Sequence, residues 1–252
     1  MSPSTSDAPA ETSLVVALPA GGGGAGMFAQ LRKALPAGTG LVVPDLPGRG
    51  RRTRAPRELT VPGLAAELAA ELEPRIAGRP YAVFATCFST IVGLELVWQL
   101  LERGLPPTRA LLVSGRQPPD VAPPFEALDK LSDEEVLDGM RRFWPSELDW
   151  ESMPKALHDI LLRQTRRDNE LGLGYVYEHR GPLPVPVIAY QGMDDPGVTV
   201  PELSAWGAHT SVSFTLRLVP GGHYFYMTHT DRLAGELGAL LAGLPGQDDR
   251  LS

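Results

Sequence analysis

The chain has 252 residues, of which 43% are hydrophobic and 21% charged, and its 23 Lys and Arg against 30 Asp and Glu give a net charge of −7. This length suits one large α/β domain, and the acidic balance argues against general binding to nucleic acid or to an anionic membrane surface. The single cysteine excludes an internal disulfide and a thiolate-rich zinc site, and it is typical of a reducing compartment.

The first residues, 1–12, are rich in Ser, Pro and Ala and have neither the basic segment nor the apolar core of a signal peptide. We therefore expect a disordered tail there and a cytoplasmic protein. Apolar runs elsewhere are too short to cross a bilayer, so no membrane partner is expected. One domain is expected over residues 13–243, followed by a second tail at 244–252.

Short apolar, β-branched runs alternate with longer amphipathic runs along most of the chain. Strands that are apolar throughout are typical of a parallel sheet covered on both faces. The alternation predicts an α/β protein with a mostly parallel, doubly wound sheet, whose site lies at the carboxyl ends of the strands. The predicted strands are Ser13–Leu18, Gly40–Pro44, Tyr81–Ala85, Ala110–Val113, Val185–Tyr190 and Ser213–Leu218, and the predicted helices are Val61–Arg75, Thr90–Arg103, Val200–Ala208 and Asp231–Ala242.

A glycine run follows the first predicted strand, and it allows two interpretations. Residues Gly21–Gly26 satisfy G-x-G-x-x-G, and Asp45 ends the next strand at about the twenty-residue spacing of a dinucleotide-binding fingerprint. The Gly21 backbone N–H could instead share an oxyanion hole with the N–H of Phe88. The second interpretation joins this loop to the three candidate side chains described next, which a dinucleotide site would leave unexplained.

The third predicted strand runs directly into a long helix through Ala85-Thr86-Cys87-Phe88-Ser89. A sharp strand-to-helix turn exposes its central side chain and needs small residues two positions before and after, as Ala85 and Ser89 are. The sole cysteine occupies this tip, where the dipole of the helix N-terminus favours a thiolate. Cys87 is therefore a candidate nucleophile, and a buried structural cysteine is the alternative.

From about residue 117 to residue 182 the alternation stops, and no convincing strand is present. Helical patterns cover Ser132–Phe143 and Met153–Tyr177, and Ser132 with Glu135 forms the sequence of a capping box. A helical insertion rich in apolar and aromatic residues predicts a lid over the site. An ordinary packing layer is the alternative.

Two loops after the last predicted strands carry the other candidate side chains. Gly192-Met193-Asp194-Asp195-Pro196 follows the fifth strand, and Pro220-Gly221-Gly222-His223 follows the sixth. An imidazole over the carboxyl edge of the sheet could act as a base, and a carboxylate bonded to it would fix its tautomer. We favour His223 and Asp195, with Asp194 as the alternative acid.

In the order Cys87, Asp195, His223 these residues resemble an α/β-hydrolase, and more closely the stand-alone type II thioesterases of polyketide and nonribosomal peptide biosynthesis. The resemblance extends from about Ser13 to Leu241. It rests on seven segments: Leu18-Pro19-Ala20-Gly21-Gly22, Asp45-Leu46-Pro47-Gly48-Arg49-Gly50, Arg103-Gly104-Leu105-Pro106-Pro107, Val113-Ser114-Gly115-Arg116, Leu131-Ser132-Asp133-Glu134-Glu135, Gly192–Pro196 and Pro220–His223.

The family ordinarily has G-H-S-M-G at the strand-to-helix turn and P-H-A-G-G in the first loop. Here Cys87 replaces the serine, and Ala20 stands where the first loop has histidine. The resemblance implies that Cys87 is the nucleophile, His223 the base and Asp195 its orienting acid. It also implies that the backbone N–H groups of Gly21 and Phe88 form the oxyanion hole.

The resemblance implies a thioesterase that acts on acyl groups held as phosphopantetheine thioesters, on an acyl-carrier or peptidyl-carrier protein or on CoA. A helix N-terminus and an imidazole can lower a thiol pKa from about 8.5 to near or below 7. Attack by Cys87 would give a second thioester that keeps its activation. Transfer to an amine or alcohol acceptor, as in an acyltransferase or cyclase, therefore stays open, as does a non-catalytic relative that binds carrier protein.

Carrier proteins are acidic as a class, so we expect this acidic chain to meet one through a local basic patch. Two runs of arginine are candidates, with a solvated surface as the alternative for each. They are Arg49, Arg51, Arg52, Arg54 and Arg57 beside the expected site, and Arg163, Arg166 and Arg167 near the expected lid. The histidines are scattered and no H-E-x-x-H occurs, so neither a metal nor another cofactor is expected.

Overall fold

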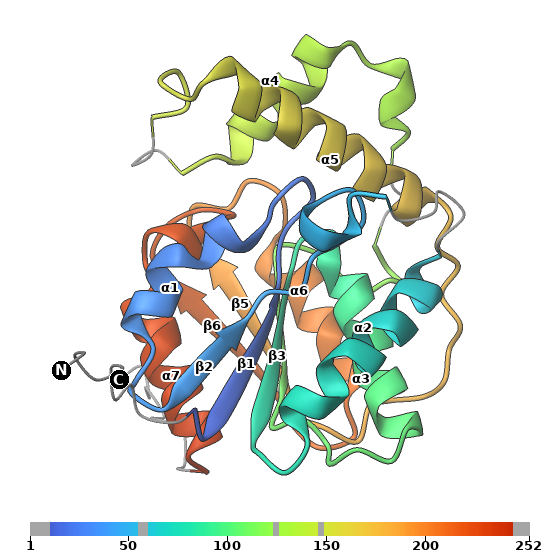
Figure 1. Ribbon diagram of the computed structural model, residues 1–252, viewed down its shortest axis with the longest axis vertical. Coiled ribbons are helices and arrows are strands. Elements are labelled where there is room, and N and C mark those ends of the chain that lie inside the picture. The colour runs from blue at the N-terminus through green and yellow to red at the C-terminus, as the bar shows by residue number, and fades with distance from the viewer. Residues whose placement is uncertain (1–10, 55–59, 123–125, 146–148, 244–252) are drawn as a thin grey trace, which may run out of the picture.

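The computed structural model describes residues 11–54, 60–122, 126–145 and 149–243. Its centre is a six-stranded sheet in the order β2-β1-β3-β4-β5-β6, in which every neighbouring pair is parallel (Figure 1). This confirms the predicted parallel α/β sheet. The strands are β1 Ser13–Leu18, β2 Thr39–Val42, β3 Tyr81–Thr86, β4 Leu111–Ser114, β5 Val187–Gly192 and β6 Phe214–Val219.

Helices cover both faces of the sheet, as a doubly wound fold requires (Figure 1). Along β1, Val15 and Ala17 pack with α1 (Ala29–Ala34) and α7 (Asp231–Leu241). Leu14, Val16 and Leu18 pack on the opposite face with α2 (Val61–Ile76) and α3 (Ser89–Glu102), together with α6 (Val200–Ser204). Burial on both sides is the reason why this strand is apolar from Leu14 to Leu18.

The strand order reverses direction between β1 and β3, which are neighbours. Leu18 at the end of β1 pairs in register with Ala85 near the end of β3. Because the chain leaves these two strands toward opposite sides, their following loops border a crevice at the carboxyl edge, where open α/β sheets bind ligands. The glycine loop and Cys87 are the residues that emerge there.

Between β4 and β5 the described residues include the 3-10 helix Leu128–Lys130, α4 (Asp133–Phe143) and α5 (Lys155–Leu173). Ser132 and Glu135 form the expected capping box at the start of α4. Figure 1 shows α4 and α5 as a separate layer above the sheet, on the side of its carboxyl edge. The insertion therefore lies over the crevice between β1 and β3.

Some predicted boundaries were wrong. α1 was not predicted from the sequence. The helix expected over Val200–Ala208 is α6 followed by the 3-10 helix Ala205–His209. The smaller elements are the 3-10 helices Ala25–Phe28, Gly50–Arg52 and Phe225–Met227. The expected tails lie outside the described residues, except for residues 11 and 12 at the border of the first. Within the described ranges, every helix is too short or too polar to traverse a bilayer.

Candidate active site

Cys87 lies at the turn between β3 and α3 with a backbone φ of +52°. Among the described residues it is the only non-glycine residue with positive φ. Such a conformation is costly for a residue with a Cβ and tends to occur where function needs it. The Cys87 N–H donates to the carbonyl oxygen of Ser114 at 2.8 Å, which holds the turn against the end of β4. The turn leaves the thiol half-buried at the carboxyl edge.

The residues around the turn show how it tolerates alanine and serine in place of glycine. A Cβ added to Gly93 of α3 would lie 2.6 Å from the Cβ of Ala85, so the missing side chain of Gly93 makes room for Ala85. Ser89 Oγ donates to the carbonyl oxygen of Pro19 at 2.5 Å, and Thr86 Oγ1 donates to that of Leu18 at 3.2 Å. The turn thereby holds the start of the glycine loop.

His223 follows β6 and lies between Cys87 and Asp195. Its Nδ1 is 2.9 and 3.0 Å from the two carboxylate oxygens of Asp195, which can only accept, so Nδ1–H donates to them. Its ring also hydrogen-bonds Cys87, and Nε2 is the nitrogen left for that bond. Asp194 is exposed, and its N–H donates to Gly221. The structure thus brings Cys87, His223 and Asp195 together and leaves Asp194 outside.

The imidazole is enclosed on its other sides. A Cβ added to Gly115, at the end of β4, would lie 2.7 Å from His223 Cε1, so only glycine fits beside the ring. The Phe143 ring of α4 is centred 4.8 Å from the imidazole, and the Tyr224 ring is centred 4.9 Å from it. These contacts fix the ring and hold it in a largely apolar surrounding.

The electrostatics of this group favour charge separation between sulfur and imidazole. Burial raises the pKa of the Cys87 thiol, but the charge and hydrogen bond of His223, the Phe88 N–H and the charge of Arg116 outweigh it and lower that pKa overall. Burial lowers the pKa of His223, but the Cys87 charge and the bond to Asp195 raise it to about 10. Both shifts favour the pair of thiolate and imidazolium over the pair of neutral groups.

The glycine loop after β1 borders this pair. A Cβ added to Gly21 would lie 3.7 Å from the Cβ of Phe88, so the two backbone segments expected to form an oxyanion hole are adjacent. The Phe88 N–H donates to the Cys87 sulfur and so helps to lower the pKa of the thiol. The stabilisation of an oxyanion by the N–H groups of Gly21 and Phe88 stays a prediction.

The same loop does not fit a dinucleotide pyrophosphate. The Gly22 N–H already donates to Asp168 Oδ2 at 2.8 Å, and that buried carboxylate would repel a phosphate. Asp45, the acid at ribose-binding spacing, instead accepts from the Arg51 N–H at 2.9 Å. The Gly22 N–H and Asp45, which a dinucleotide site would need, are therefore both engaged in other hydrogen bonds.

An apolar cavity of about 330 Å³ lies between the glycine loop and the helical insertion. It suits an uncharged acyl chain better than a polar ligand, because its walls are almost entirely hydrocarbon and thioether. The lining residues are Gly21, Gly22, Gly23, Gly24, Gly26 and Met27 of the loop, Met140, Trp144, Met153, Leu157, Ile160, Leu161 and Gln164 of the insertion, and Tyr224 and Met227.

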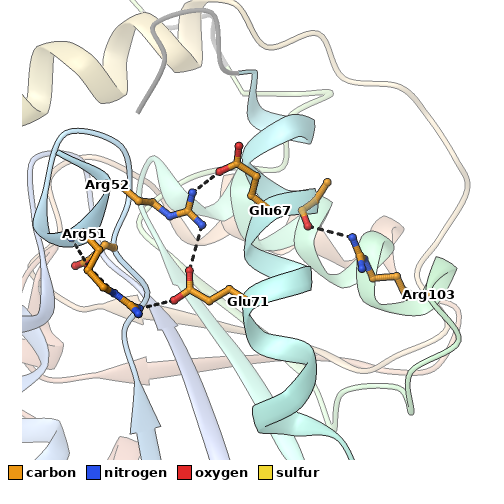
Figure 2. Close-up of polar contacts among 7 residues, drawn as sticks. Arg51, Arg52, Glu67, Glu71 and Arg103 are labelled. Atoms are coloured by element: carbon orange, nitrogen blue, oxygen red, sulfur yellow. Dashed lines mark hydrogen bonds and ion pairs between the residues drawn. The ribbon is translucent and has the colours of Figure 1, made fainter. Parts of the chain in front are cut away.

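Much of the charge of the first arginine run is paired with carboxylates of the chain itself. Arg49 is only 7% exposed and is paired with Asp168, so it is not available to a partner. Figure 2 shows Arg51 bonded to Glu71 and Arg52 bonded to Glu67 and Glu71 of α2. The acidic face of α2 therefore balances much of this charge, and Arg57 lies outside the described residues.

The second arginine run borders an open hollow of about 480 Å³. Arg163, Arg166 and Arg167 line it together with Gly48 and Thr53, although Arg166 is paired with Asp133. Ile160 and Gln164 line both this hollow and the apolar cavity, so the two spaces meet along α5. A polar entrance thus leads to an apolar interior.

Three residues near the site were not singled out individually as functional from the sequence. Gly115 and Arg116 belong to the Val113–Arg116 segment, which served only as a mark of resemblance, and their approach to His223 and Cys87 follows from the fold. Asp168 lies in the middle of a polar helical run and gave no signal, although it is a buried acid. Among the described residues, no group of three or more His, Cys, Asp or Glu is placed to hold a metal ion.

The thioesterase domain family matches residues 13–241 of the chain. The linear gramicidin dehydrogenase LgrE of Brevibacillus parabrevis is 33% identical over 215 residues, which cover 84% of this chain and 81% of that protein. The RedJ thioesterase of the prodiginine pathway in Streptomyces coelicolor is 30% identical, with a TM-score of 0.82 and coverage of 95% and 91%. The type II thioesterase BorB of the borrelidin cluster is 30% identical, with a TM-score of 0.81 and coverage of 92% and 95%.

Proposed function

The chain belongs to the thioesterase domain family, and we propose that it is a type II thioesterase of polyketide or nonribosomal peptide biosynthesis that uses Cys87 as its nucleophile. Its substrate would be an acyl group on the phosphopantetheine of a carrier protein. The observation that carries the proposal is the chain of hydrogen bonds from Cys87 through His223 to Asp195 at the carboxyl edge of the sheet.

In the first half-reaction the Cys87 thiolate attacks the thioester carbonyl carbon. The carbonyl electron pair moves to oxygen, which the N–H groups of Gly21 and Phe88 stabilise. The pair returns as the bond to the pantetheine sulfur breaks, and the leaving thiolate takes the proton of the His223 imidazolium. The product is an acyl-Cys87 thioester beside a neutral imidazole.

In the second half-reaction that imidazole removes a proton from water as the water oxygen attacks the acyl carbon. Collapse of the new oxyanion breaks the bond to Cys87 and releases a carboxylic acid. The enzyme returns to thiolate and imidazolium, so protons balance over the cycle. Asp195 holds His223 in the tautomer that presents Nε2 to the reacting atoms.

The cavities supply the two ends of the substrate. The apolar cavity beside Gly21 would take the acyl chain, and the hollow beside Arg163 would take the phosphate of the arm or acidic side chains of the carrier. The two spaces meet at Ile160 and Gln164, which gives the arm a route along α5 to the glycine loop.

Mass measurement of the intact protein during turnover of an acyl-carrier thioester tests the nucleophile. We expect an acyl adduct on Cys87 in the native chain and none in Cys87→Ala, whose turnover should fall by at least about a hundredfold. Cys87→Ser is the matched control, because it keeps the geometry but must lose its proton during attack. An unmodified native protein, with Cys87→Ala equally active, would refute the proposal.

The same reaction distinguishes hydrolysis from acyl transfer. The acyl-enzyme is itself a thioester and remains reactive toward an amine or alcohol that reaches the cavity. If free acid appears at the same rate with and without added acceptors, the protein is a hydrolase. If product forms only with an acceptor, it is an acyltransferase, and a native chain that binds carrier without an adduct is a non-catalytic relative.

A further inference from the structure

A buried ion pair connects the helical insertion to the loop after β2. Asp168 of α5 is 2% exposed and Arg49 is 7% exposed. Arg49 Nη2 lies 2.5 and 2.6 Å from the two oxygens of Asp168, so the carboxylate accepts two charge-assisted bonds from one nitrogen. Replacing such a pair by well-packed apolar residues is often neutral or stabilising. Net stability alone therefore does not explain why this ion pair is present.

Both partners also bond the glycine loop. Asp168 Oδ2 accepts from the Gly22 N–H at 2.8 Å, and Arg49 Nη1 donates to the carbonyl oxygen of Gly23. These contacts hold two successive residues directly after Gly21. Gly22 has φ of +77°, and a Cβ added to it would lie 2.1 Å from Thr165 Oγ1 of α5, so the loop and the helix approach closely.

The turn between β3 and α3, which carries Cys87, holds the other end of the loop. Ser89 bonds the carbonyl oxygen of Pro19, and Thr86 bonds that of Leu18. The peptide that carries the Gly21 N–H thus lies between an anchor on the sheet and an anchor on α5. Only the second anchor belongs to an element that lies outside the sheet and its two helix layers.

We propose that Asp168 is a positioning residue for acyl transfer. With Arg49 it sets the Gly21–Gly22 backbone so that the Gly21 N–H faces the developing oxyanion beside Phe88. It follows that the Gly21 N–H takes its place in the oxyanion hole only when α5 is packed against the glycine loop. This inference rests on the proposed function, because it gives Asp168 a role in the same reaction.

The test compares two reactions of Cys87. Acylation by an acyl thioester creates an oxyanion, whereas alkylation by iodoacetamide displaces iodide at a saturated carbon and creates none. In the double variant Arg49→Met/Asp168→Leu, which keeps the pair filled with apolar side chains, we expect acylation to slow by about ten- to a hundredfold. Alkylation should stay within about twofold, because the Cys87–His223 pair is untouched.

An exposed ion pair on the same helix provides the matched control. Lys155 and Asp159 of α5 pair at 2.9 Å. Lys155→Met/Asp159→Leu removes the same two charges without touching the loop, and both rates should match the native protein. Asp168→Asn is the second variant, which preserves volume and should slow acylation in the same direction if the double variant does not fold.

Each result decides the matter. Slowed acylation with unchanged alkylation supports the positioning role. Equal loss of both reactions in Asp168→Asn, or no loss of either, overturns it. A native protein that alkylates rapidly but is never acylated would instead refute the proposed function, so the two failures are distinguishable.

Discussion

At the residue scale, the resting charge of Cys87 is the property that separates this site from a serine site. His223 and its neighbours lower the pKa of Cys87. The pH at which half of the Cys87 thiol is ionised should therefore lie below the ordinary thiol pKa of about 8.5. We expect the iodoacetamide alkylation rate to rise with pH around this lowered midpoint and to level off above it. In His223→Ala, where burial still raises the pKa of the thiol and only Phe88 and Arg116 still lower it, the midpoint should move to higher pH. Identical pH profiles for the two proteins would contradict the ion pair.

The protonation of His223 should change once the sulfur is acylated. Burial lowers the pKa of His223, and the Cys87 charge is the largest cause that raises it to about 10. Acylation removes that charge, so the pKa of the imidazole should fall and a neutral base should form at the stage that needs one. We expect single-turnover deacylation to rise with pH to a plateau reached well below pH 10, while the His223 NMR signal of the free enzyme titrates near 10. Coinciding midpoints would show that the charge of Cys87 has no such effect.

Gly115 tests how closely the imidazole is fitted. In Gly115→Ala the new methyl would lie 2.7 Å from His223 Cε1, and the residue would keep an unfavourable φ of +72°. We expect a loss of turnover of at least about tenfold, because the ring must move from Cys87 or Asp195. Gly104→Ala is the control, since Gly104 has φ of +73° and open space around its Cβ direction. Both variants should lose about 1 kcal/mol or more of stability from backbone strain, but only the first should lose activity.

At the scale of elements, the fit of α3 against β3 decides whether the nucleophile turn can form without flanking glycines. Gly93→Ala would place its Cβ 2.6 Å from that of Ala85, and we expect a net destabilisation of about 1–3 kcal/mol despite the better helix propensity of alanine. Ala85→Gly/Gly93→Ala should recover most of that loss, as denaturant unfolding would measure. Gly235→Ala in α7, where nothing surrounds the added methyl, should be neutral or stabilising. Additive effects at Ala85 and Gly93 would show that the contact is unimportant.

The elements that the sequence predicted well are those with strong local signals. β1 and β3 are apolar at nearly every position, and α4 begins at the Ser132–Glu135 capping box that the sequence contains. The short α1 was missed because six residues cannot show a helical period. α5 was expected to reach Tyr177, but it ends at Leu173 before Gly174, where tertiary contacts of the following segment replace helical periodicity.

The candidate site divides in the same way. Cys87 follows β3 directly and His223 lies in the short loop after β6, so the fold class alone brings them to one edge of the sheet. The choice between Asp194 and Asp195 depends on the loop conformation, which the sequence left open and the structure resolves geometrically. Arg49 was assigned to the surface because its burial against Asp168, 119 residues away, has no local signature.

At the scale of the whole molecule, the acidic chain must still attract an acidic partner if the proposed function is correct. Arg163 of α5 is exposed at the open hollow that leads to the apolar cavity. We expect Arg163→Glu to lower kcat/KM for a carrier-bound acyl thioester by about three- to tenfold, mainly through slower association, and to weaken its dependence on salt. The same acyl group on a small uncharged thiol should react at the native rate, because it does not use the hollow.

Arg75→Glu is the matched control for that charge reversal. Arg75 is exposed at the end of α2, which leads to the amino end of β3 on the side of the sheet opposite the site. It changes the net charge by the same amount, so a general electrostatic effect would slow both variants equally. A loss confined to Arg163→Glu and to the carrier-bound substrate would place the carrier at α5. Equal rates for all three proteins would mean that the carrier approaches over another surface, since a charge facing it at close range must alter its association.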